Sequence, residues 1–140
     1  FRSRWEANYA RILNHRKEQG EIFKWEYERR RFGFPAEISS KLSVGSYLPD
    51  FAIWWRSGDG EPDEYHEIKG FITEKGRQAV LGMREAYPDV KVVIVGEREY
   101  YDLENRYGRS LPYWESRGTQ NRKVGQLLDS SCHQAEHGIG

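Results

Sequence analysis

Two short segments of the sequence place ionisable side chains inside apolar stretches. The first reads Tyr-Leu-Pro-Asp-Phe-Ala-Ile around Asp50, and the second reads Tyr-His-Glu-Ile-Lys-Gly-Phe around Glu67 and Lys69. A carboxylate removed from water is costly unless it is paired or coordinates a metal. Two converging carboxylates form a hard oxygen site that suits Mg²⁺ or Mn²⁺. Such a metal polarises a phosphoryl oxygen and lowers the pKa of a bound water, so the pattern predicts phosphodiester hydrolysis, with Lys69 beside that water or the developing negative charge.

The alternation of side chains along a strand predicts which of these groups face each other. Successive side chains point to opposite faces of a sheet, so Glu67 and Lys69 share one face and Ile68 lies on the other. In the same way, the side chains of Asp50 and Phe51 point to opposite faces. If the two strands pair, the carboxylates of Asp50 and Glu67 converge while Phe51 and Ile68 pack into the core.

Hydrophobic periodicity predicts the elements that carry these groups. Helical spacing is found at residues 3–18, 73–87 and 97–107. Strand patterns cover residues 21–28, 31–34, 47–55, 65–71 and 91–95. Residues 35–46 resemble a loop or an extended arm, and 120–128 could form a short helix. This order of helix, strands, helix, strand, helix favours an α/β or α+β fold around a mixed sheet.

Two motifs resemble the signature of the PD-(D/E)XK nucleases. They are Pro49-Asp50 and Glu67-Ile68-Lys69, each with hydrophobic flanks and the second followed by Gly70. More narrowly, the chain is similar from residue 1 to about residue 95 to the phage endonuclease I group of Holliday-junction resolvases. That similarity is carried by Phe1-Arg2-Ser3, Glu6, the strand at 23–28, the arm before Tyr47-Leu-Pro-Asp-Phe51, and Tyr87-Pro88.

The resemblance implies a restriction-endonuclease-like fold, in which a mixed central sheet is flanked by helices. The nuclease domain would span residues 1–115, and residues 116–140 would be a polar C-terminal extension or tail. It also implies roles for five residues. Asp50 and Glu67 would bind Mg²⁺, for which Mn²⁺ could substitute, together with the backbone carbonyl of Ile68. Glu6 would be an acid contributed by the first helix, and Lys69 would orient the attacking water.

Several of these candidates have structural alternatives. Asp50 could end a turn or pair with an arginine. Glu67 and Lys69 could form an exposed pair on an edge strand. Ser3 and Glu6 have the spacing of a capping box, in which the two residues hydrogen-bond reciprocally at a helix start.

Candidate phosphate-binding residues are Arg2, Arg4, Lys75 and Arg77. The last two follow the second motif at the start of a helix, where backbone N–H groups also favour anions, although a solvated helix face explains them as well. The 22 basic and 22 acidic residues give no net charge and therefore no global attraction to DNA. Between the motifs lies an acidic stretch that DNA would avoid: Asp59, Glu61, Asp63 and Glu64.

The expected partner is branched or junction DNA, bound by a homodimer in which the 34–46 arm could cross between subunits. Alternatives are a restriction-like, nicking or single-strand nuclease of the same fold, and a non-catalytic nucleic-acid-binding module. No apolar run approaches the roughly 20 residues of a membrane span. The single cysteine, Cys132, suits a reducing cytoplasm, as in a bacterium or in a host infected by a phage. Cys132, His133 and His137 are too few for the usual zinc site.

Overall fold

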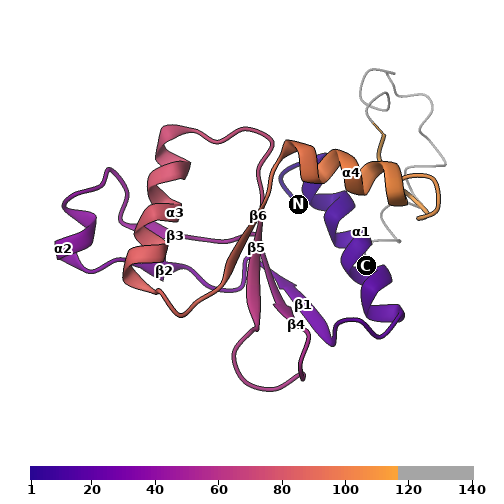
Figure 1. Cartoon of the computed structure of the whole chain (residues 1–140), viewed down its shortest axis with the longest axis horizontal. Coiled ribbons are helices and arrows are strands. Elements are labelled where there is room, and N and C mark those ends of the chain that lie inside the picture. Colours follow the sequence, from indigo (N-terminus) through magenta and orange to yellow (C-terminus); the bar gives the residue numbers. More distant parts are fainter. Residues whose placement is uncertain (117–140) are drawn as a thin grey trace.

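The structure, a computed structural model, describes residues 1–116, and its α+β architecture has three layers (Figure 1). The described elements are α1 (Arg4–Glu18), β1 (Lys24–Tyr27), β2 (Phe32–Gly33), α2 (Ala36–Ser39), β3 (Ser46–Tyr47), β4 (Phe51–Trp54), β5 (Glu64–Ile68), α3 (Glu74–Ala86), β6 (Val92–Val95) and α4 (Glu97–Tyr107). Of the expected C-terminal extension, everything after residue 116 lies outside the described residues, as do the expected helix at 120–128 and Cys132.

The central sheet is mixed, as the order of elements predicts. Its strands lie in the order β1-β4-β5-β6, with β1, β4 and β5 antiparallel and β5 and β6 parallel. A parallel pair needs a crossover connection, and α3 supplies it. Strands β2 and β3 form a separate two-stranded antiparallel sheet.

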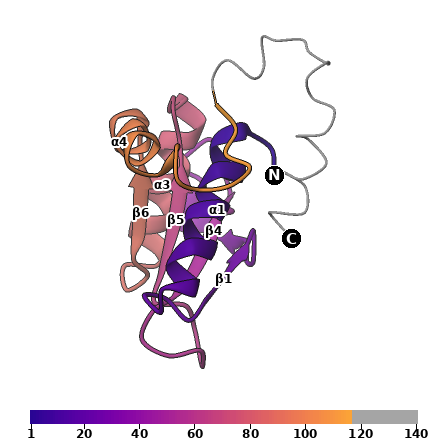
Figure 2. The same cartoon turned by 90° about the vertical axis from the view of Figure 1, so that its right-hand side faces the viewer.

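Each face of the central sheet is covered by its own set of elements. Figure 1 shows the sheet between α1 and α4 on one side and α2, α3 and the β2-β3 sheet on the other, and Figure 2 shows α1 running alongside the strands. Phe51, Ile53 and Ile68 pack toward α1 and α4. Ala52 and Tyr65 belong to the second core, beneath α3.

The three long helices begin and end close to where the sequence predicts. Helix α1 starts after Ser3, whose Oγ accepts a hydrogen bond from the Glu6 N–H at 3.1 Å. Helix α3 is capped in the same way by Thr73, which accepts from the Gly76 N–H at 3.0 Å. Such caps satisfy donors that have no partner within the helix. Helix α4 has the predicted bounds.

The expected single strand over residues 47–55 is wrong. Tyr47 belongs to β3 and pairs with Phe32, whereas β4 begins at Phe51 in the other sheet. The chain therefore crosses between two sheets at residues 48–50, where Pro49 has no N–H to donate to a ladder. Asp50 consequently lies immediately before β4 and not inside a strand. Strand β5 likewise ends at Ile68, short of the predicted residue 71.

For residues 35–46 the sequence predicts a loop or an extended arm, and the extended arm is wrong. The segment is mostly loop, contains the short helix α2 and lies back on α3, where Phe34 and Leu42 fill the space next to Gly82. A Cβ at Gly82 would come within 2.4 Å of the Phe34 ring and 2.9 Å of Leu42 Cδ1. The missing side chain at this position lets the segment pack closely on its own helix.

Candidate active site

The strand register brings the two predicted acids together. Phe51 pairs with His66 in the antiparallel β4-β5 ladder, and the same register continued by one residue sets Asp50 opposite Glu67. Directly opposed residues of antiparallel strands share a face and lie close together. Both side chains are buried, with exposed fractions of 3% for Asp50 and 5% for Glu67.

Asp50 is held by the neighbouring strand and by the residues before α1. Its Oδ2 accepts a hydrogen bond from the Ile68 N–H at 2.8 Å, and its Oδ1 lies 3.7 Å from Arg2 Nη2. Burial, reinforced by the negative charge of Glu67, raises the pKa of Asp50 to about 7. Desolvation and a like charge both disfavour the ionised form, so this carboxyl lacks a full complement of positive charge.

Glu67 has two partners on the same face of the sheet. Its Oε1 accepts a hydrogen bond from the Tyr47 hydroxyl at 3.0 Å, and its Oε2 lies 3.4 Å from Lys69 Nζ. Burial raises the pKa of Glu67, while Lys69 and the Tyr47 hydrogen bond oppose that rise. Lys69 and Glu67 are therefore not the exposed edge-strand pair of the alternative interpretation, since β5 is central and Glu67 is buried.

Glu6 serves the helix start and also lies near the acids. Its Oε1 accepts from the Tyr27 hydroxyl at 2.5 Å and from the Arg2 N–H at 3.3 Å. Its negative charge contributes to the raised pKa of Asp50. A strict capping box would require the Glu6 side chain to accept from the Ser3 backbone N–H. Here it accepts from the Arg2 N–H instead.

The charges linked by these contacts do not balance. Arg2 also pairs with Glu28 at 2.5 Å. Counted over residues 1–116, the contacts given above involve the carboxylates of Glu6, Glu28, Asp50 and Glu67 and the cations of Arg2 and Lys69. This is a formal excess of two negative charges, which a divalent cation would offset.

A groove of about 630 Å³ opens beside Glu67 on the α3 side of the sheet. Its wall contains four cationic side chains, those of Arg2, Arg31, Lys69 and Lys75. The first turn of α3 also lines it, and the N–H groups at a helix start favour anions. The groove therefore offers positive charge next to the buried acids, as a nucleic-acid backbone requires.

Two of the four predicted phosphate-binding residues lie away from this groove. Arg4 Nη1 is 3.6 Å from Glu104 Oε2 and donates to the Glu115 carbonyl oxygen at 3.2 Å. Arg77 Nη2 lies 2.7 Å from Glu74 Oε2 in the first turn of α3. The structure thus brings Arg2 and Lys75 to the groove but holds Arg4 and Arg77 in ion pairs elsewhere.

Three contributors could not be identified from the sequence. Tyr47 reaches Glu67 from the second sheet, and Tyr27 reaches Glu6 from β1. Arg31 lies in a run of three arginines that looks like an ordinary solvated surface, yet it lines the groove and donates to Ser46 Oγ at 3.1 Å. Of the three, only Arg31 gives a signal in the sequence, which is the arginine run itself. All three contacts join residues far apart in the chain, so sequence patterns do not predict them.

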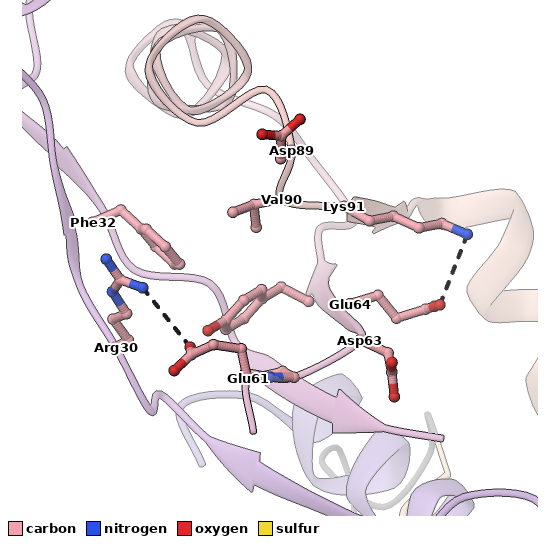
Figure 3. A pocket seen from close by; sticks show the side chains of 10 residues that line it. Arg30, Phe32, Glu61, Asp63, Glu64, Asp89, Val90 and Lys91 are labelled. Atoms are coloured by element: carbon pink, nitrogen blue, oxygen red, sulfur yellow. Dashed lines mark ion pairs between the residues drawn. The ribbon is translucent and has the colours of Figure 1, made fainter. Parts of the chain in front are cut away.

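The acidic stretch lies at the far end of the β4-β5 hairpin from Asp50 and Glu67. There Glu61, Asp63 and Glu64, but not Asp59, form part of the lining of a small pocket of about 170 Å³ (Figure 3). Glu61 pairs with Arg30 at 4.0 Å, and Glu64 pairs with Lys91 at 3.8 Å. Asp63 lies 3.5 Å from Arg56, so three of the four acids have a cation of their own, and none of the four lines the groove.

His66 lies on the opposite face of β5, as the alternation predicts. Its Nδ1 is 2.6 Å from the Tyr9 hydroxyl and its Nε2 is 2.7 Å from Glu64 Oε1. Burial lowers the pKa of His66 despite the nearby Glu64 carboxylate. With both nitrogens bonded inside the core, His66 has a structural role.

Within residues 1–116, no group of three or more His, Cys, Asp or Glu side chains is arranged to hold a metal ion. Asp50 and Glu67 supply two carboxylates. Mg²⁺ in enzymes is commonly held by one or two carboxylates, with water and substrate phosphate completing its shell. The hard oxygen donors and the excess of negative charge thus fit such an ion.

Comparison with known proteins finds no family model that matches the chain, no curated protein with a significant match and no solved structure with a significant match. In the part of the chain that the structure describes, no helix is both long and apolar enough to cross a membrane.

Proposed function

We propose that this protein is a metal-dependent DNA endonuclease with a restriction-endonuclease-like fold. The observation that carries the proposal is the opposed, buried pair Asp50 and Glu67, with Lys69 Nζ 3.4 Å from Glu67 and a cationic groove alongside. The Ile68 carbonyl is a further candidate ligand, since its residue lies between Glu67 and Lys69.

Each part of the site has a distinct task in phosphodiester hydrolysis. Asp50 and Glu67 would hold Mg²⁺ or Mn²⁺, which when bound neutralises charge and polarises the phosphodiester. Lys69, with a side chain that is 40% exposed, can donate to the attacking water or to the negative charge that develops on phosphate. Arg2 and Lys75 would hold the DNA backbone along the groove, fixing the reacting phosphate beside the acids.

Branched DNA is the proposed substrate, and a homodimer is the proposed assembly. The acidic stretch at the far end of the hairpin leaves the groove open to a polyanion. Because the 34–46 segment lies on its own α3, it is not a free crossing arm in this structure. A dimer would therefore need an exchange of this segment or another surface.

The activity test uses two variants of the site and two matched controls. We expect Glu67→Gln and Lys69→Ala to lower the cleavage rate of a four-way junction in Mg²⁺ by at least ~100-fold, because removing a preorganised electrostatic group costs that much. Exposed Glu18→Gln and Lys17→Ala should cleave at the wild-type rate.

Linear duplex and reactions without Mg²⁺ complete that assay. Unchanged cleavage by both site variants would place the activity elsewhere. Equal cutting of junction and linear duplex would remove the branched-DNA claim alone. Binding without cleavage in any divalent metal would instead support a binding module.

A further inference from the structure

We propose that Phe71 is a stacking platform for an unpaired base next to the phosphate that is cut. This inference rests on the proposed function and specifies its substrate class. The platform would select DNA in which a nucleotide at the cleavage point is already unstacked, as at a fork, flap or branch point. It assigns a specificity-determining role to a residue outside the nuclease motif.

Phe71 borders a second groove that shares Lys69 with the cationic one. This groove, of about 480 Å³, is lined by the apolar side chains of Phe71, Trp5 and Ile68, by Lys69, and by the two acids Glu6 and Glu97. Lys69 therefore stands between a cationic groove and a more apolar one. A nucleotide has the same division, since its phosphate is anionic and its base has an apolar face. A phosphate held beside Lys69 would direct one flanking base toward Phe71.

The exposure of Phe71 is unusual for an aromatic residue so close to a core. Its exposed fraction is 79%, and the neighbouring Ile72 is 44% exposed. Trp5, by contrast, stacks on Tyr100 with ring centroids 4.1 Å apart and is partly buried against the core. Phe71 is thus the aromatic ring of this groove that can accept a base, because base stacking needs an accessible π-face.

The backbone fixes Phe71 from both sides. Lys69 N–H donates to the Val95 carbonyl oxygen at 3.0 Å, which ties the end of β5 to β6. Gly70 lies against the Trp5 ring so closely that a Cβ would come within 2.7 Å of Trp5 Cζ3. On the other side, Thr73, two residues after Phe71, caps α3. Phe71 therefore projects from a short connection whose two ends are fixed, so its backbone has a defined place relative to Lys69.

Charge favours nucleic acid over a protein partner as the occupant. The cationic side chains of Arg2, Arg31 and Lys75 line, together with Lys69, the groove that Phe71 does not border. An apolar ring at the end of a cationic path matches a strand whose backbone lies in the path and whose last base leaves the stack. This combination is the usual means by which proteins bind single-stranded nucleic acid.

The test measures whether Phe71 and one DNA base act as a pair. Fluorescein-labelled forked DNA is titrated in Ca²⁺ with the full chain, and anisotropy gives Kd. Each unpaired nucleotide near the fork is replaced in turn by an abasic residue. We expect one abasic position to weaken wild-type binding roughly tenfold, within the range of base–aromatic stacking. At that position Phe71→Ala should lose little further affinity.

Two further protein variants serve as controls for this pairing experiment. Phe71→Trp should retain the selectivity, and Phe23→Ala should behave as wild type, because Phe23 is also exposed, at 56%, but lies outside both grooves. The proposal would be overturned if the fold-losses in affinity caused by Phe71→Ala and by the abasic position multiply when the two are combined, because independent effects multiply. A changed oligomeric state of Phe71→Ala in sedimentation with unchanged DNA selectivity would also overturn it, and would assign the ring to a protein interface.

The outcome is separable from that of the proposed function. Binding in Ca²⁺ reports the pairing of Phe71 with a base whether or not the wild-type protein cuts in Mg²⁺. Coupling without cleavage in Mg²⁺ or Mn²⁺ would support the platform and remove the nuclease. Cleavage without coupling between Phe71 and a base would support the nuclease and remove the platform.

Discussion

Asp50 and Glu67 are buried opposite each other, and within residues 1–116 the contacts around them involve more negative than positive side chains. In a structural ion pair, burial is compensated by a partner of equal charge. Here Asp50 accepts one backbone N–H, and Arg2 approaches it only at 3.7 Å. A protein that keeps two acids in this arrangement carries a cost in stability, and such costs are typical of functional sites.

That cost has a definite dependence on pH. The pKa of Asp50 is raised to about 7 in the folded protein. An unfolded aspartate ionises near pH 4, so the folded protein binds more protons between these values. Without a divalent cation, stability should therefore fall as pH rises from about 4 to 7, and the loss should remain above pH 7.

Asp50→Asn removes the ionisable group and should remove this loss. At pH 8 in EDTA we expect the free energy of unfolding of the variant to exceed that of wild type by up to about 4 kcal/mol, because the pKa rises from 3.8 to about 7 and one unit of pKa corresponds to about 1.4 kcal/mol. The gain at pH 4 should be much smaller. Urea denaturation at both pH values measures it. Exposed Asp59→Asn should match wild type at both. A variant destabilised equally at both pH values would show that Asp50 is a structural hydrogen-bond acceptor only.

At the scale of elements, the cations of the groove come from four separate segments, the first of which is the stretch before α1 that carries Arg2. Arg31 comes from the start of the small sheet, Lys69 from the end of β5, and Lys75 from the first turn of α3. None of these positions is near another in sequence except Lys69 and Lys75. The close packing of residues 34–42 on Gly82 brings the small sheet to α3, and so brings Arg31 to the groove.

The groove predicts different roles for two arginines that look alike in sequence. Arg31→Ala should weaken DNA binding several-fold and lower the slope of log K against log salt by about 1, because one phosphate contact is lost. Arg4→Ala should leave that slope unchanged, since Arg4 is paired with Glu104. Anisotropy titrations at several salt concentrations measure both. An unchanged slope for Arg31→Ala, or a reduced one for Arg4→Ala, would contradict the placement of DNA in the groove.

The elements differ in how well sequence patterns predict them, and the reason is their range of interaction. Helices α1 and α4 follow from local periodicity and caps, and the faces of Asp50 and Glu67 follow from strand alternation. The switch between sheets at Pro49 is not predicted, because an apolar run does not reveal which partner strand it meets. The contact of Tyr47 with Glu67 spans 20 residues and depends on that switch.

At the scale of the whole molecule, functional groups are separated by face and by end. The acids and the cationic groove lie on the α3 side of the sheet, while His66 is bonded into the core beneath α1. The acidic stretch occupies the opposite end of the β4-β5 hairpin. This separation lets a chain with no net charge present a cationic surface at one place.

A crystal structure of the full chain soaked in Mn²⁺, with anomalous difference density, tests the central claim most directly. We predict one peak in contact with carboxylate oxygens of both Asp50 and Glu67, and its loss in Glu67→Gln. Full Mn²⁺ occupancy elsewhere with none between these two acids at millimolar metal would contradict the account.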